Sequence, residues 1–162
     1  MATGLVFYLF EALGYKDTFH LANLFFFRGL LESALRNYKK GAAQNDPKSM
    51  YALAILYENG IGVNQDHSEY IFWMKRAARF GHSGAIGECY IDGIDQDINT
   101  VEGMHILEEY GKNCNESFVQ SSIAGYYLEG KIVSKNLVAA KKWFKLSADN
   151  YNPISSEILK TL

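Results

Sequence analysis

Three segments of the sequence share one pattern of residues, and this repetition constrains the fold more than any other feature. In each copy an apolar residue and a small residue are followed, at fixed spacing, by a tyrosine and then a glycine. The copies span residues 53–60, 86–93 and 123–130. Their tyrosines are 33 and then 37 residues apart. Self-similarity at a period of about 20–50 residues is typical of solenoids, so we expect an array of similar units.

Each unit reads as a pair of antiparallel helices. In the first copy, Leu53, Ala54 and Tyr57 have the spacing of one helix face. Gly60 suits the left-handed residue that commonly ends a helix, because glycine enters that conformation without steric cost. A large apolar residue stands 13 positions after each glycine, where a second helix would bury it: Trp73, Ile106 and Trp143.

The second helix of each unit has a good N-cap residue, whose side-chain oxygen can accept from the amides of the first turn. These residues are Asp66, Asn99 and Asn136. Glu69 and Glu102 stand three positions after the first two, which predicts capping boxes. Gly103 and Gly111 lie inside the helix that begins at 100, and each costs up to about 1 kcal/mol relative to alanine. We therefore expect the weakest amide protection at 99–114.

The pattern predicts ten helices in a single helical-repeat domain, 1–162. Their expected ranges are about 4–13, 18–28, 31–45, 48–59, 67–80, 83–92, 100–112, 117–129, 137–149 and 154–161. The expected division is an N-terminal capping helix (1–17), a degenerate repeat (18–46), a repeat (47–81), a degenerate repeat (82–115), a repeat (116–151) and a C-terminal capping helix (152–162). The apolar run 2–10 lacks the basic residues and cleavage site of a signal peptide, so we expect a cytoplasmic protein.

Composition excludes several functional classes. A net charge of −2 gives no basic field for phosphates, so we expect no nucleic-acid partner. The apolar run is too short to span a membrane, and we expect no membrane partner.

Cys89 and Cys114 are expected to be free thiols, with a disulfide between them as the alternative. The histidines lack the paired spacing of metal ligands, and no nucleophile elbow or phosphate loop occurs. We expect no metal, no cofactor, no catalytic residue and no enzyme activity.

The segment from Ser49 to Gly81 resembles the Sel-one-like repeat (SLR) family, whose members are related to tetratricopeptide repeat proteins. The positions that carry the resemblance are Leu53, Tyr57, Gly60, Gly62, Val63, Asp66, Trp73, Ala77, Ala78 and Gly81. The match is loose around 83–114 and good around 119–151, where the final glycine is missing. The resemblance implies an all-α, right-handed α-α superhelix (solenoid) of antiparallel helix pairs, with about four to five repeats.

The resemblance also implies a function. It predicts a protein–protein interaction scaffold or adaptor that binds a protein or peptide on its concave face. One alternative is a bacterial immunity or effector-type protein dedicated to one partner. A further alternative is a small enzyme, or a hydrolase accessory, that uses the groove. We expect a monomer, with a homodimer as the alternative.

By comparison with tetratricopeptide arrays, first-helix residues beside each repeated pattern would line the concave face. The predicted partner contacts are Lys48, Tyr51, Glu58, Asn59, Glu88, Asp92, Ser121 and Glu129. Because half of these side chains are acidic, the pattern favours a basic partner.

Overall fold

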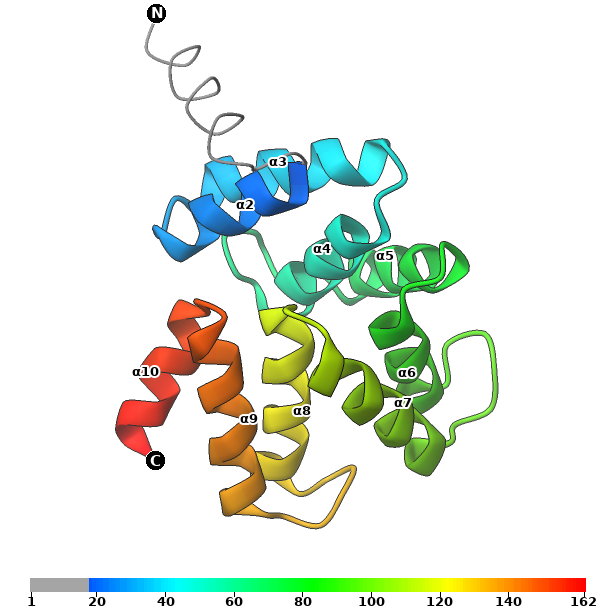
Figure 1. Cartoon of the computed structure of the whole chain (residues 1–162). Coiled ribbons are helices and arrows are strands. Elements are labelled where there is room, and N and C mark those ends of the chain that lie inside the picture. Colours follow the sequence, from blue (N-terminus) through cyan, green and yellow to red (C-terminus); the bar gives the residue numbers. More distant parts are fainter. Residues whose placement is uncertain (1–17) are drawn as a thin grey trace, which may run out of the picture.

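The structure, a computed structural model, describes residues 18–162, and this part of the chain is a stack of antiparallel helix pairs (Figure 1). The helices are α2 (Thr18–Phe27), α3 (Leu31–Ala43), α4 (Pro47–Asn59), α5 (His67–Arg79), α6 (Ser83–Asp92), α7 (Thr100–Asn113), α8 (Ser117–Glu129), α9 (Leu137–Asp149) and α10 (Pro153–Thr161). Consecutive helices pack as the pairs α2–α3, α4–α5, α6–α7 and α8–α9, and α10 packs on α9. The prediction of an all-α helical-repeat solenoid is confirmed.

The helix ends lie within two residues of their predicted positions. The reason is local chemistry. Gly60, Gly93 and Gly130 end α4, α6 and α8 in the left-handed conformation, with φ of 65°, 69° and 74°. The predicted N-caps are also confirmed, since the side chains of Asp66 and Asn99 accept from first-turn amides of α5 and α7. The helix predicted at 4–13 and the capping helix predicted at 1–17 lie outside the described residues.

The prediction of capping boxes is wrong. A capping box needs the amide of the N-cap residue, and here another acceptor already takes it. The Asp66 amide donates to the carbonyl of Tyr57 at 3.0 Å, and the Asn99 amide donates to that of Tyr90 at 2.8 Å. The carboxylate of Glu69 instead accepts from Nε1 of Trp73 at 2.8 Å. The repeated tyrosine therefore anchors the start of the second helix through its backbone carbonyl.

The core runs continuously through the stack. It includes buried side chains from α4, α5, α7 and α9, namely Leu53, Met74, Leu107 and Phe144. Trp73, which the pattern places in the interior, is only partly buried and packs at the edge of the core. The residue after it, Met74, is fully buried together with Tyr70 and Ala77, so Met74 takes the central inward position of α5 that the pattern assigns to Trp73.

The array curves enough to bring its first and fourth helix pairs into contact. The ring of Phe118, at the start of α8, lies 4.9 Å from that of Phe26 in α2 and 6.2 Å from that of Tyr38 in α3, measured between ring centroids. Phe27 and Tyr151 make a second ring contact at 5.6 Å, between α2 and the turn after α9. In Figure 1, α2 lies above the upper ends of α8 and α9.

Candidate functional site

Two of the predicted partner contacts lie in the interior. Tyr51 and Glu88 are 1% and 2% exposed, and the tyrosine hydroxyl donates to Oε1 of Glu88 at 3.2 Å. The hydroxyl of Tyr126 donates to the other oxygen of the same carboxyl group. Because α4, α6 and α8 each supply one member of this trio, the carboxyl group ties three helix pairs together. It offers no surface to a partner, which corrects the expectation that Tyr51 and Glu88 line an open face.

Burial raises the pKa of Glu88 from its ordinary value of 4.5 to about 7, although the hydrogen bonds from Tyr126 and Tyr51 oppose the shift. Burial does so because it removes water from the charged form of the carboxyl group. A raised pKa of this size is common at catalytic sites. Here tyrosines enclose the carboxyl group, so the shift belongs to the core.

The remaining acidic residues of the predicted set already have partners within the protein. Nδ1 of His67 lies 3.0 Å from Oε2 of Glu58. Asp92 accepts a hydrogen bond from the hydroxyl of Tyr70. Glu129 is paired with Lys131 at 2.9 Å.

The polar members of the set are partly satisfied as well. Nδ2 of Asn59 donates to the carbonyl of Ile55 at 2.9 Å, and Oγ of Ser121 donates to that of Phe118 at 2.9 Å. Five residues of the set stay predicted partner contacts: Glu58, Asn59, Asp92, Ser121 and Glu129.

A second buried polar cluster joins the starts of α6 and α8. His82 caps α6, because its Nδ1 accepts from the amide of Ala85 at 3.0 Å. Its Nε2 therefore carries the proton and donates to Oε2 of Glu116 at 2.7 Å. Burial works to raise the pKa of Glu116, but hydrogen bonds from His82 and Tyr110, with the charge of Lys48, outweigh it and hold this pKa below its ordinary value.

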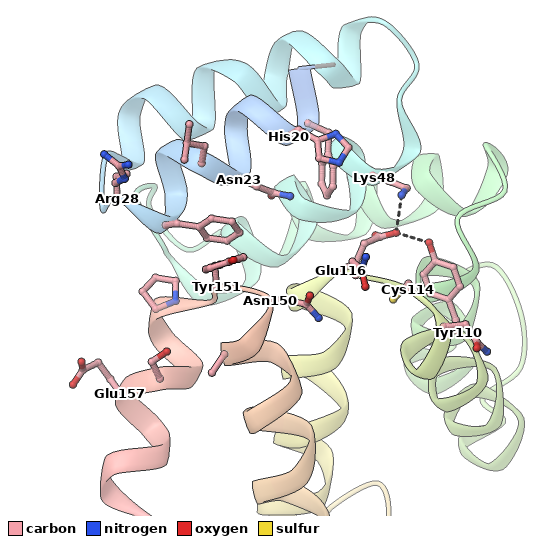
Figure 2. Close-up of a pocket in the computed structure, with 18 residues that line it drawn as sticks. His20, Asn23, Arg28, Lys48, Tyr110, Cys114, Glu116, Asn150, Tyr151 and Glu157 are labelled. Atoms are coloured by element: carbon pink, nitrogen blue, oxygen red, sulfur yellow. Dashed lines mark hydrogen bonds and ion pairs between the residues drawn. The ribbon is translucent and has the colours of Figure 1, made fainter. Parts of the chain in front are cut away.

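A cleft of about 1190 Å³ opens beside this cluster (Figure 2). One wall is α2, and the other is formed by the turns after α7 and α9 together with the start of α10. The lining residues are Phe19, His20, Asn23, Leu24, Phe27, Arg28, Lys48, Tyr110, Asn113, Cys114, Asn115, Glu116, Ala148, Asn150, Tyr151, Pro153, Ser156 and Glu157. Among the predicted contacts, Lys48 alone lines this cleft.

Two amide side chains lie on opposite walls of the cleft, and each is held by a hydrogen bond from behind. The hydroxyl of Tyr38 donates to Oδ1 of Asn23 at 2.5 Å, which leaves the Asn23 amide nitrogen to point outward. Nδ2 of Asn150 donates to Oε1 of Gln120 at 2.8 Å, which leaves Oδ1 of Asn150 to point outward. Figure 2 shows this nitrogen and this oxygen directed into the space between the walls. The cleft thus presents one fixed donor and one fixed acceptor.

Charged groups stand at both ends of the cleft (Figure 2). At one end, Nζ of Lys48 lies 3.4 Å from Oε1 of Glu116, and the hydroxyl of Tyr110 donates to the same carboxylate at 2.5 Å. At the other end, Arg28 and Glu157 lie on opposite walls. Because both signs of charge are present, the cleft has no strong preference for a basic or an acidic ligand.

Sequence reasoning missed this cleft because its walls come from helix pairs that are far apart in the sequence. Two signals were available. The run Phe25–Phe27 places more aromatic rings on one helix than a single core face can take, and Phe27 lines the cleft. The final glycine missing from the last repeat is replaced by Tyr151, which also lines it.

The described part of the chain contains no cluster of histidine, cysteine, aspartate and glutamate side chains that could hold a metal ion. Cys89 and Cys114 are free thiols, as expected. None of the helices from α2 to α10 is long and apolar enough to cross a membrane.

Comparison with protein families decides the classification. The Sel1 repeat family matches residues 19–46, 47–82 and 120–152, which is more than half of the chain. The protein belongs to the Sel1 repeat family. Sel1 repeat proteins are generally scaffolds that bind protein partners, and they are generally not enzymes. The matched ranges omit residues 83–119, where the resemblance is also loose by inspection of the sequence.

Two bacterial repeat proteins are among the solved structures that resemble the protein. A Sel1 repeat protein from Oxalobacter formigenes is 25% identical, with 79% of this chain and 98% of that chain covered and a TM-score of 0.46. The protein c5321, a protective antigen in uropathogenic Escherichia coli that displays an SLR fold, is 27% identical, with 76% of this chain covered and a TM-score of 0.42. The aligned region covers 27% of the c5321 chain.

Proposed function

We propose that this Sel1 repeat protein is a non-enzymatic scaffold that binds an extended segment of a partner protein in the cleft between α2 and the turns after α7 and α9. The observation that carries the proposal is the pair of opposed amides. The outward nitrogen of Asn23 can donate to a peptide carbonyl, and the outward oxygen of Asn150 can accept from a peptide N–H. An extended peptide presents both groups along its length.

The fixed orientation of these amides supports peptide binding. Each is locked by a hydrogen bond to a buried group, so little side-chain entropy is lost when a ligand binds. Behind Asn150, the amide nitrogen of Gln120 donates to the carbonyls of Cys114 at 2.9 Å and Gly111 at 3.3 Å. The acceptor in the cleft is therefore supported by a chain of hydrogen bonds that ends in the backbone.

Catalysis is the weaker alternative. Glu88 has the strongly raised carboxyl pKa that a general acid needs, but it is 2% exposed and enclosed by tyrosines. Its carboxyl group cannot reach a molecule in the cleft. Glu116, which does line the cleft, is already bound to His82, Tyr110 and Lys48. A dedicated role toward a single partner is compatible with the cleft, and identification of the partner would decide it.

To test the proposal, the wild-type protein is used to select short binding peptides from a displayed random library. The variant Asn23→Asp keeps the oxygen that accepts from Tyr38 and replaces the outward donor with an acceptor. Calorimetry is expected to show that this change weakens the selected peptides by about tenfold or more, because a hydrogen bond is lost and two acceptors oppose each other.

The matched control is Glu58→Lys, which reverses a charge on the originally predicted face without touching the cleft. It is expected to leave peptide affinity unchanged. If Glu58→Lys reduces peptide affinity and Asn23→Asp leaves it intact, the peptide binds on the face that carries Glu58, and the proposed binding in the cleft is refuted.

A further inference from the structure

Tyr151 adopts a backbone conformation that tyrosine strongly disfavours. It lies in the turn between α9 and α10 with φ of 65°. The corresponding turn residues after α3 and α5 are Asn45, with φ of 62°, and Gly81, with φ of 84°. Glycine and asparagine enter the left-handed region readily, whereas a bulky side chain does so at a cost. The protein thus places a large aromatic residue where the turns after α3 and α5 use residues suited to the geometry.

The turn itself does not need the tyrosine. The amide of Tyr151 donates to Ala148 at 2.8 Å, and that of Asn152 donates to Ser147 at 3.1 Å. In the turn after α5, the amide of Gly81 donates to Ala78 at 2.9 Å, so glycine supports the same backbone hydrogen bond. The ring gains little from burial either, since Tyr151 is 72% exposed.

What Tyr151 does have is a position in the cleft. Its ring lies 5.6 Å from that of Phe27 on the opposite wall, and it directly follows Asn150 in the chain. Figure 2 shows Tyr151 beside the amide of Asn150. The two rings form an apolar surface next to the opposed donor and acceptor. Strained residues are concentrated at binding sites, and exposed aromatic residues often carry much of the binding energy.

We infer that Tyr151 is the aromatic anchor of the cleft. With Phe27, it binds a bulky apolar or aromatic side chain of the partner segment, while Asn23 and Asn150 bind the adjacent backbone. The inference rests on the proposed function and adds the chemical class of the ligand: an extended peptide with a large apolar residue at the anchor position. Backbone strain at Tyr151 persists because the gain on binding outweighs the small contribution that this largely exposed ring makes to folding.

The test uses two small probes, N-acetyl-L-phenylalaninamide and N-acetylglycinamide, which share the peptide groups and differ in the side chain. Each is titrated into isotopically labelled protein and followed by nuclear magnetic resonance. The side-chain amide signals of Asn23 and Asn150 are expected to shift with both probes. The phenylalanine probe is expected to bind about tenfold more tightly, because aromatic contact adds to amide recognition.

Three variants separate binding from folding. Tyr151→Gly is expected to reduce the phenylalanine probe to the affinity of the glycine probe, and to leave the melting temperature level or raise it by about 2–4 °C as strain is released. Tyr151→Phe is expected to retain wild-type affinity. The matched control, Phe72→Ala, removes a side chain that is 52% exposed on α5 and outside the cleft, and it is expected to leave affinity unchanged.

Equal affinity of the two probes for the wild-type protein, or unchanged phenylalanine-probe affinity in Tyr151→Gly, would overturn the anchor and leave the cleft in place. If neither probe shifts Asn23 and Asn150, the anchor and the proposed cleft both fail. A fall in the melting temperature of Tyr151→Gly would show that the ring serves the fold, and this too would overturn the inference.

Discussion

At the scale of single residues, the buried carboxyl group of Glu88 connects packing with ionisation. Its pKa in the folded protein, about 7, lies above the ordinary value of 4.5 that an unfolded chain would show. Between these values the folded state binds more protons than the unfolded state. The contribution of Glu88 to stability is therefore fully present at low pH and is lost as pH rises through about 7.

Glu88→Gln keeps the shape of the protonated side chain and removes its ionisation. Relative to the wild type, this variant is expected to gain up to about 3 kcal/mol in free energy of unfolding as pH rises from about 5 to about 8. Urea unfolding at both pH values measures the difference. Glu32→Gln, at an exposed position on α3, serves as the control and is expected to follow the wild type. Parallel pH profiles for wild type and Glu88→Gln would contradict the assignment.

At the scale of the helix pair, two glycines set how closely α6 and α7 approach. A Cβ atom added at Gly103 would lie 2.6 Å from Cγ1 of Ile91 and 2.7 Å from the carbonyl oxygen of Gly87. Such distances are too short for packed atoms, so the backbones touch here because no side chain separates them. The glycine that weakens α7 in isolation also permits its contact with α6.

Gly103→Ala is expected to lower the free energy of unfolding by about 1–3 kcal/mol, because overpacking outweighs the gain in helix propensity. Gly125→Ala is a matched control, since a Cβ added at this α8 position meets nothing within 4 Å. It is expected to raise stability by about 0.5–1 kcal/mol. Denaturant titrations of both variants provide the measurement, and a stabilising effect of Gly103→Ala would refute the close approach.

Helix positions could be predicted from the sequence because their determinants are local. Gly60 and Asp66 stop and start helices through their own conformations and hydrogen bonds, independently of distant residues. The burial of Glu88 could not be predicted in this way. It depends on Tyr126, which is 38 residues away on the first helix of the next pair. The cleft depends on α2 and Tyr151, which are still farther apart in the sequence.

At the scale of the whole molecule, Phe118 joins the beginning of the described array to its fourth helix pair. It is 4% exposed and contacts rings in both α2 and α3. In an open solenoid each unit contacts only its neighbours, and stability is a sum of local terms. Here α2 and α3 receive additional stabilisation from α8, so their unfolding is coupled to that of a distant pair.

Phe118→Ala is expected to cost about 3–5 kcal/mol and to speed amide exchange in α2 and α3 more than in α5. Hydrogen exchange followed by mass spectrometry measures the three helices separately. Phe144→Ala is the control. Phe144 is also buried, at 3% exposed, but it lies in α9, which is not the helix that contacts α2 and α3 through Phe118. Similar exchange patterns in both variants would argue against the long-range coupling.

The contact between Phe118 and Phe26 also fixes the number of helix pairs that lie between α2 and α8. One more helix pair inserted between α5 and α6 would rotate and translate everything that follows, so α8 would no longer meet α2. The same insertion would separate Asn23 from Asn150 and divide the cleft. An open solenoid can lengthen by internal duplication and keep its older surfaces, whereas the segment between α2 and α8 can diversify only by substitution within a constant number of units. Its turns, with their exposed side chains, are where such variation costs least.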